Sequence, residues 1–234
     1  MRFRCLFHVH THHSFDSLLS PRRIVSKARQ LGVDALIVTD HNTIQGSLEA
    51  RDLAGGRPLV VVAAEYQSEK GDIIGLFLKE EIRSRRSEEI ISDIHAQGGL
   101  VVLPHPYKGH LLDSVLLSDV DLIESYNARC SQYDNARAEK LARDWKRPAL
   151  AGADAHCSLE LGVALNDFKA AAPRNESDLR ATLISSPRKA ITGRAPKICR
   201  PYSQMVKAAK TRDLRLFLYQ VRQLGLSLTR SDYN

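Results

Sequence analysis

The sequence lacks several features that would place it in special classes of protein. No apolar run in its 234 residues approaches the ~20 residues that a membrane-spanning helix needs. The first residues carry charge and show neither a long apolar stretch nor a small-residue cleavage site, so we expect no signal peptide. The four cysteines form no Cys-x-x-Cys pair, which argues against a disulfide framework or a thiolate zinc site. These absences predict a cytoplasmic protein with reduced thiols.

Composition and charge place the chain among ordinary globular proteins with one unusual region. Hydrophobic residues make up 43% and charged residues 26%, which is enough for one large α/β domain or two small ones. From Lys169 onward there are 14 Lys and Arg against 4 Asp and Glu, whereas the preceding part has 20 against 23. The basic C-terminal part is consistent with binding of phosphate-bearing ligands or nucleic acid, and equally with a solvated basic face.

Strand-like and helix-like segments alternate along the chain. Buried-strand patterns occur at 4–10, 34–42, 57–66, 71–78, 99–107, 119–129 and 147–156. Helical patterns occur at 20–32, 44–53, 87–99, 131–146 and 175–185. Repeated β-then-α units of this length predict a parallel sheet or barrel.

The pattern changes after about Pro196. Residues Leu214, Phe217, Leu218, Val221 and Leu224 fit one stripe of a helix. We therefore expect a barrel domain over residues 1–195 and a basic helical extension over 196–234. The stripe predicts that this extension packs on the barrel, and contact with a partner is the alternative.

Potential metal ligands follow the predicted strands at their carboxyl ends, where parallel α/β proteins gather their functional residues. Side chains two apart on a strand share a face, which applies to the pair at 8 and 10 and to the pair at 154 and 156. The candidates are His8, His10, Asp16, His41, Glu65, His105, Asp154 and His156. Asp40 is a candidate for orienting His41.

The ligand types indicate the chemistry. Imidazoles and carboxylates without thiolates suit zinc, manganese or iron, and these candidates exceed what one tetrahedral ion can use. Two or more ions sharing a bridging carboxylate would fit. Closely spaced ions suit the hydrolysis of phosphate esters, because they bind phosphoryl oxygens, lower the pKa of a bridging water and neutralise charge in the transition state.

Four motifs in order resemble those of the polymerase-and-histidinol-phosphatase (PHP) domain family. They are "HVHTHHSFD", "TDHN", "PHP" and "GADAH", with an isolated Glu after the third predicted strand. The resemblance runs from about Phe3 to Ala195 and is to the small members of that family. It implies an α/β fold, a distorted (β/α)7 TIM-like barrel, with two or three metal ions at its carboxyl-end mouth.

The resemblance also implies an assignment of ligands. By analogy, a first ion is held by His8, His10, Glu65 and Asp154, and a third by Asp16, His41 and His156. Glu65 bridges to a second ion that His105 also holds. Glu65, His105 and Asp154 are thus the expected catalytic group. The family often supplies a further histidine near 119–129, where this sequence offers only Glu124 or Asn127.

Several nearby side chains are candidates for contact with the substrate phosphate. They are Lys108, Arg129, His12 and His110. Surface salt bridges are the alternative for Lys108 and Arg129. The acid that protonates the leaving group is a metal-bound water or one of His12, His13 and His110.

Three functions are compatible with these residues. The first is a metal-dependent phosphoesterase acting with metal-activated water on a small-molecule or nucleotide phosphate. The second is a nuclease, or an accessory module, acting on nucleic-acid ends, which the basic C-terminal part supports. The third is a PHP-like scaffold that binds metal without catalysis. The sequence names neither the substrate nor the metal.

Overall fold

The computed structural model describes residues 1–229, so the last five residues of the predicted extension lie outside the described part. The strands are β1 (Phe3–Val9), β2 (Ala35–Val38), β3 (Leu59–Val61), β4 (Ala63–Ser68), β5 (Gly71–Leu76), β6 (Leu100–Leu103), β7 (Leu122–Asn127), β8 (Ala149–Gly152), β9 (Ala164–Phe168) and β10 (Arg188–Thr192). The helices are α1 (Pro21–Gln30), α2 (Gln45–Ala54), α3 (Ser87–Ala96), α4 (Ser114–Asp119), α5 (Gln132–Asp144), α6 (Glu176–Ser185), α7 (Cys199–Lys210) and α8 (Leu214–Thr229).

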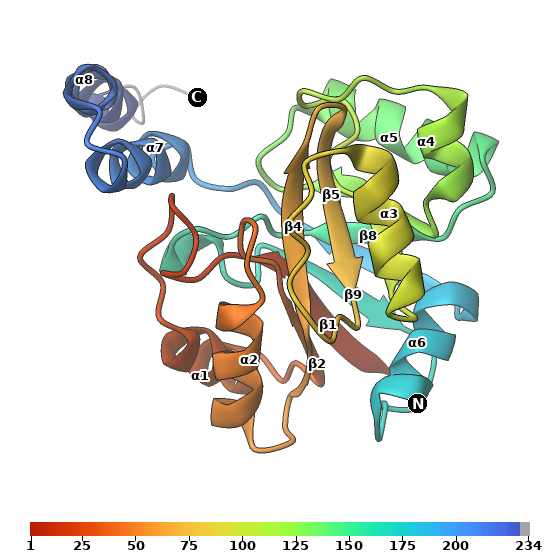
Figure 1. The fold of residues 1–234 in the computed structure, drawn as a ribbon. Helices are drawn as coiled ribbons and strands as arrows, with labels where there is room; N and C mark the ends of the chain where they lie inside the picture. Colours follow the sequence, from red (N-terminus) through yellow and green to blue (C-terminus); the bar gives the residue numbers. More distant parts are fainter. Residues whose placement is uncertain (230–234) are drawn as a thin grey trace.

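The strands form two five-stranded sheets, in the orders β10-β9-β1-β2-β3 and β4-β5-β6-β7-β8 (Figure 1). The runs β1-β2-β3 and β6-β7-β8 are parallel, as the alternating pattern predicts. The pairs β4-β5, β5-β6, β1-β9 and β9-β10 are antiparallel. The expected regular (β/α)7 barrel is therefore not formed: the fold is mixed α/β with an open arrangement of two sheets. Direct turns, with no intervening helix, join β4 to β5 and reverse the strand direction.

The two sheets approach each other at the carboxyl ends of their parallel strands. Isolated parallel bridges there join Val9 to Ala155 and His41 to Glu65. Val9 and Ala155 each lie between two predicted metal ligands in the sequence, and His41 and Glu65 are themselves predicted ligands. The sheets thus converge where the candidate ligands lie.

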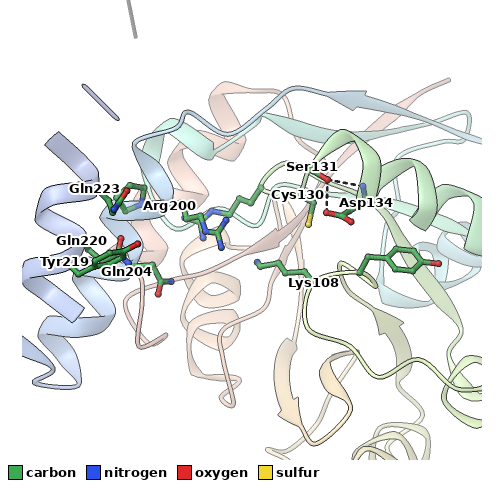
Figure 2. Close-up of a pocket in the computed structure, with 12 residues that line it drawn as sticks. Lys108, Cys130, Ser131, Asp134, Arg200, Gln204, Tyr219, Gln220 and Gln223 are labelled. Carbon is green, nitrogen blue, oxygen red and sulfur yellow. Dashed lines mark hydrogen bonds between the residues drawn. The ribbon is translucent and has the colours of Figure 1, made fainter. Parts of the chain in front are cut away.

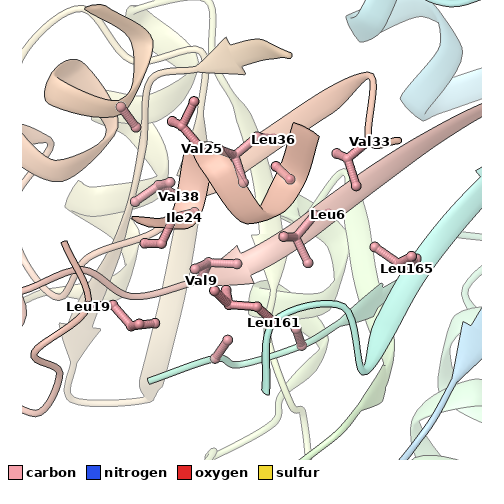
Figure 3. Packing of buried hydrophobic residues seen from close by; sticks show 14 of the residues in the cluster. Leu6, Val9, Leu19, Ile24, Val25, Val33, Leu36, Val38, Leu161 and Leu165 are labelled. Carbon is pink, nitrogen blue, oxygen red and sulfur yellow. The ribbon is translucent and has the colours of Figure 1, made fainter. Parts of the chain in front are cut away.

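The core that supports β1 and β2 explains the local structure of this region. In α1, the Ser20 side chain accepts a hydrogen bond from the backbone N–H of Arg23 and caps the helix, and Pro21 occupies its first turn. Its buried face carries Ile24 and Val25, which belong to the same cluster as Leu6 of β1 (Figure 3). Fully burying an aliphatic side chain stabilises the fold by about 1.5–3 kcal/mol. This packing holds the strand that ends in the histidine motif.

A second cluster lies between the sheets. It contains Phe3, Cys5 and Phe7 from alternate positions of β1, together with Ile74 and Phe168. Alternation along the strand therefore sends one face of β1 toward the inter-sheet core and the other toward α1. The ring of Phe3 stacks on that of Phe168, 4.7 Å away.

The C-terminal segment forms two helices that stand at one side of the sheets (Figure 1). Helix α7 contacts the body of the molecule, and α8 packs on α7. On α8, Leu214 and Leu218 are 68% and 60% exposed, so the stripe that the sequence predicts is only partly covered by the described residues. Within residues 1–229, no helix has both the length and the apolar character needed to cross a membrane.

Candidate metal centre

The eight predicted ligands come together at the carboxyl ends of the parallel strands. His8 is the penultimate residue of β1, Glu65 lies in β4, and the others follow β1, β2, β6 and β8 in loops. All are buried except His41, whose side chain is 10% exposed. Side chains separated by up to 148 positions in the sequence thus share one small volume.

The ligand atoms form overlapping groups that are each able to hold a divalent ion. Within each group the side-chain nitrogen and oxygen atoms all lie within 4.8 Å of one another. The groups are His10, Asp16, His41 and His156; His8, His10 and Glu65; and His8, His105 and Asp154. The first group contains the whole set that the resemblance implies for a third ion.

Glu65 lies at the middle of the centre. Its Oε1 atom lies 3.0 Å from Nε2 of His105, and its Oε2 atom lies 3.3 Å from Nε2 of His8. The same Oε2 atom lies 3.3 Å from Nδ1 of His41. A carboxylate that reaches imidazoles from three strand ends has the geometry of a bridging ligand.

Three of the predicted ligands have an unusual backbone conformation. His8, His105 and Asp154 have φ angles of 65°, 27° and 48°, in the left-handed region that residues other than glycine seldom adopt. Such residues cost on the order of 1–3 kcal/mol each and are concentrated at functional sites. At His8 the pairing of β1 with β2 also shifts register. His8 and His10 therefore converge, with ring centroids 5.1 Å apart, through a bulge rather than through regular strand alternation.

Glu124 and Asn127 position three of the predicted ligands through hydrogen bonds. Oε1 of Glu124 lies 2.7 Å from Nδ1 of His8, and its Oε2 accepts a hydrogen bond from the backbone N–H of His105. The amide of Asn127 donates to Glu124 and, over 3.2 Å, to Oδ2 of Asp154. Gly152 makes room for this arrangement, because a Cβ there would overlap the Glu124 carboxylate. A glutamate inside the apolar run of β7 was the available sequence signal for this orienting role.

Asp40 influences the position of the predicted ligands through the hydroxyl group of Ser14. Its carboxylate accepts hydrogen bonds from the hydroxyl groups of Thr11 and Ser14, over 2.7 and 2.9 Å. The Ser14 hydroxyl in turn accepts the backbone N–H of His41 and lies 3.1 Å from Nδ1 of His10. Asp40 thus orients His41 indirectly, by fixing the loop after β1.

Helix α7 also supports the loop that carries Asp16. The Lys210 ammonium group donates hydrogen bonds to the carbonyl oxygens of His12, Ser14 and Ser17, over 2.7, 2.6 and 2.9 Å. This contact spans almost the whole length of the chain. Sequence reasoning missed it, because nothing near Lys210 in the sequence indicates its partners.

The charges of the centre favour ionised carboxylates and act differently on its imidazoles. Burial and the neighbouring His156 lower the pKa of His10 to about 3. Burial works to raise the pKa of Glu65, but the adjacent His8 and His41 outweigh it and hold that pKa well below its usual range. Burial works to lower the pKa values of His8 and His41, but the neighbouring carboxylates outweigh it and raise that of His41 to about 9 and that of His8 well above its usual value. The carboxylates are thus ready to bind a cation, and a bound metal would displace the protons of these two imidazoles.

Unpartnered polar atoms mark a place that a cation could occupy. Among the described residues, the buried atoms Nε2 of His10, Oδ1 of Asp16 and Nδ1 of His41 have no hydrogen-bond partner. Leaving buried polar atoms unpaired costs free energy unless another group satisfies them. The donors are nitrogen and oxygen only, which fits a divalent transition-metal ion or zinc.

Comparison with family models and with known proteins shows to which family the chain belongs. A family model described as the PHP domain matches residues 7–74, and one described as PHP-associated matches residues 132–185. The uncharacterized protein MJ1587 of Methanocaldococcus jannaschii is 38% identical over 136 residues, which cover 52% of this chain and 80% of that protein. The chain belongs to the PHP domain family.

Solved structures share the fold of this PHP protein at low identity. A two-domain protein of Bacteroides vulgatus containing a predicted PHP-like metal-dependent phosphoesterase has a TM-score of 0.71 at 17% identity, over 82% of this chain and 65% of that one. PsfC of Pseudomonas syringae has a TM-score of 0.63 at 18% identity, over 96% and 99%. The lesion-specific endonuclease PfuEndoQ of Pyrococcus furiosus has a TM-score of 0.59 at 16% identity, over 85% and 60%.

The predicted phosphate contacts lie at different places around this PHP centre. The Lys108 ammonium lies 3.2 Å from Oδ2 of Asp154 and is half exposed. Arg129 is buried and bound to Glu160 over 2.7 Å, and it also donates to Ser203 of α7. Arg129 therefore ties α7 to the body of the molecule.

The two histidine candidates also differ in their surroundings. His12 is exposed and belongs, with His13 and Glu49, to a separate surface group. Nε2 of His110 lies 2.8 Å from the carbonyl oxygen of Asp72, and the His110 ring lies 5.5 Å from that of His105. His110 is thus beside the centre, and His12 is at the surface.

Proposed function

We propose that this protein is a metal-dependent phosphoesterase that hydrolyses a phosphate ester of a small molecule or nucleotide. The observation that carries the proposal is the convergence of eight imidazole and carboxylate side chains, with unpartnered buried donor atoms, at one end of the sheets. Membership of the PHP family and fold neighbours described as metal-dependent phosphoesterases support it. The donor set is that of zinc, manganese or iron.

In this proposal the ligands divide among two or three ions. His8, His10, Glu65 and Asp154 would hold one, and Asp16, His41 and His156 would hold another. Glu65 and His105 would hold a further ion. When bound, such ions supply Lewis-acid chemistry, which polarises phosphoryl oxygens and acidifies water. Glu65, His105 and Asp154 touch the reacting region and are the catalytic group.

The chain's own residues supply orientation and charge. Glu124 keeps the His8 ring in one tautomer by accepting from Nδ1, which leaves Nε2 as the electron-pair donor. The Lys108 ammonium, beside Asp154 and half exposed, is placed at the edge of the centre to contact an anionic group of the substrate. His110 adjoins His105, but its Nε2 atom is bound to the Asp72 carbonyl oxygen and its pKa is lowered to about 4, so it suits contact with the substrate better than protonation of the leaving group.

The experiment is turnover by metal-replete protein. Protein loaded with Mn²⁺, Zn²⁺ or Fe²⁺ is incubated with p-nitrophenyl phosphate, bis-p-nitrophenyl phosphate and a panel of nucleotides. We expect hydrolysis that a chelator abolishes and that Asp154→Asn lowers by at least about 100-fold. An absence of turnover on every ester would contradict the phosphoesterase proposal and favour the non-catalytic scaffold.

A nuclease is the second candidate. The observations that favour it are the likeness in fold to the endonuclease PfuEndoQ and the basic C-terminal part of the chain. Phosphodiester hydrolysis and salt-dependent binding of single-stranded DNA are its signatures. Turnover of the monoester alone, with no DNA binding at low salt, would exclude it.

A further inference from the structure

A cleft of about 750 Å³ separates α7 and α8 from the body of the molecule (Figure 2). One wall comes from the segments after β6 and β7 and includes Tyr107, Lys108 and Ser131. The other wall comes from α7 and α8. The cleft reaches the metal centre through Lys108, whose ammonium group lies 3.2 Å from Asp154. Its volume is within the range of about 300–1,000 Å³ that is usual for small-molecule sites.

The lining of this cleft is positively charged. Its charged residues are Lys108, Arg129, Arg200 and Asp134. Arg129 is neutralised by Glu160, and the Asp134 carboxylate is bound by the Ser131 hydroxyl at the end away from α8. Lys108, which is paired with Asp154 at the edge of the metal centre, and Arg200 are the remaining cations at the middle of the cleft.

Arg200 has no acidic partner among residues 1–229, and its guanidinium group makes no hydrogen bond there. Figure 2 shows its side chain and that of Lys108 extending into the same space from opposite walls. Lys108 is already paired with Asp154, so an anion placed between the two walls gains the free charge of Arg200 and shares the Lys108 ammonium group, which offers three donors. Lys108 lies in the segment after β6 and Arg200 lies on α7, and both are exposed, so packing does not fix either side chain in the cleft.

We propose that Lys108 and Arg200 bind a second anionic group of the substrate, a phosphate that the metal centre does not cleave. The inference rests on the proposed phosphoesterase function and names its substrate class: an organic phosphate with a further phosphate on the leaving side. That phosphate belongs either to a small bisphosphate or to the next phosphodiester of a short strand. Arginine suits this task because its planar fork binds two phosphate oxygens at once.

The helical wall completes the site for the organic part of such a substrate. Gln204 of α7 and Gln220 of α8 offer amide groups, and Tyr219 offers a ring and a hydroxyl (Figure 2). These groups hydrogen-bond and stack without adding charge. Helices α7 and α8 thereby become part of the specificity of the enzyme.

The selectivity of an Arg200→Gln variant tests the proposal. Fructose 1,6-bisphosphate is compared with fructose 6-phosphate, and the 5′-phosphorylated thymidine dinucleotide with thymidine 5′-phosphate, on Mn²⁺-loaded protein. We expect the ratio of kcat/KM for the preferred two-phosphate probe over its one-phosphate partner to fall about 10- to 100-fold, the effect of losing a charge-assisted contact. Arg22→Gln, an exposed arginine of α1, is the matched control and should leave the ratio within about twofold. The probe pair whose kcat/KM ratio falls shows whether the second phosphate belongs to a small bisphosphate or to a short strand.

Direct binding separates this inference from the proposed function. Calorimetry of the same probes with metal-free protein, in chelator, requires no turnover. We expect wild-type protein to bind a two-phosphate probe more tightly than its one-phosphate partner, and Arg200→Gln to lose about 10-fold or more of that affinity. If Arg200→Gln loses affinity for the two-phosphate probe and metal-loaded wild-type protein hydrolyses no ester, the anion site is upheld and the proposed phosphoesterase function is rejected. Turnover with an unchanged ratio, or equal binding by Arg200→Gln and Arg22→Gln, would overturn the site alone.

Discussion

The His8 ring is held between two carboxylates: its Nδ1 atom lies 2.7 Å from Oε1 of Glu124 and its Nε2 atom 3.3 Å from Oε2 of Glu65. One carboxylate fixes the ring and the other shares the metal centre with it. Carboxylate groups behind metal-binding imidazoles set the tautomer and raise the basicity of the ligand. The two glutamates therefore have different tasks although both are buried.

Replacing Glu124 by glutamine tests its orienting role. The carboxylate accepts from His8, from the His105 backbone and from Asn127, and an amide cannot accept all three. We expect the affinity for Mn²⁺ or Zn²⁺, measured by calorimetry, to fall about 10- to 100-fold. Glu139→Gln, on the exposed face of α5, serves as the control. Equal affinities for the two variants would show that Glu124 does not orient a ligand.

Removing the Lys210 ammonium group tests the support that α7 gives to the Asp16 loop. In Lys210→Met, the carbonyl oxygens of His12, Ser14 and Ser17 lose their common donor. We expect the ion at Asp16, His41 and His156 to bind about 10-fold more weakly, while ions at the other ligands keep their affinity.

The measurement for Lys210 is a metal titration that resolves the sites, with Lys197→Met as control. Lys197 is exposed and precedes α7. A uniform loss of affinity at every site would indicate a general change in folding, and no loss at any site would contradict the supporting role.

Most of the candidate ligands could be selected from the sequence because they lie near the end of an apolar strand or just after it, although Glu65 lies inside β4 and Asp16 lies in the loop beyond β1. His8 and Asp154 could be predicted in this way, since the carboxyl ends of neighbouring parallel strands meet. Strand direction, however, is not encoded in an apolar run. The β4–β5 hairpin and the strands β9 and β10 therefore differ from the regular barrel that the alternation suggested.

Long-range contacts were the other limit of sequence reasoning. Lys210 and His12 are 198 positions apart, and no local pattern joins them. Glu124 could be placed near the centre, but its role depends on the room left by Gly152, which only the packing shows. The same holds for Arg200, whose importance depends on the position of α7 opposite Lys108.

His110 makes the stability of the metal-free protein depend on pH. Burial and the neighbouring His105 lower the pKa of His110 to about 4, from an ordinary value of 6.5. Between these values the unfolded chain holds a proton that the folded protein lacks, so stability is complete above pH 6.5 and falls as the pH drops toward 4. From pH 7.5 to pH 5 this contribution amounts to about 2 kcal/mol.

Urea denaturation of wild-type protein and His110→Gln, both in chelator, measures this effect. Glutamine retains an N–H donor for the Asp72 carbonyl oxygen, to which the His110 Nε2 atom is bound. We expect wild-type protein to lose about 2 kcal/mol more than the variant on going from pH 7.5 to pH 5. A difference between the two proteins that stays constant with pH would contradict the assignment.

The proposed function depends on several ions that the converging side chains bind in one centre. Anomalous diffraction from crystals of Mn²⁺- or Zn²⁺-loaded protein, measured at the absorption edge of the metal, locates such ions. We expect two or three anomalous peaks, one among Asp16, His41 and His156 and at least one beside Glu65 and Asp154. Fully loaded crystals with no peak at these side chains, or with peaks only at the surface group of His12, His13 and Glu49, would contradict this expectation.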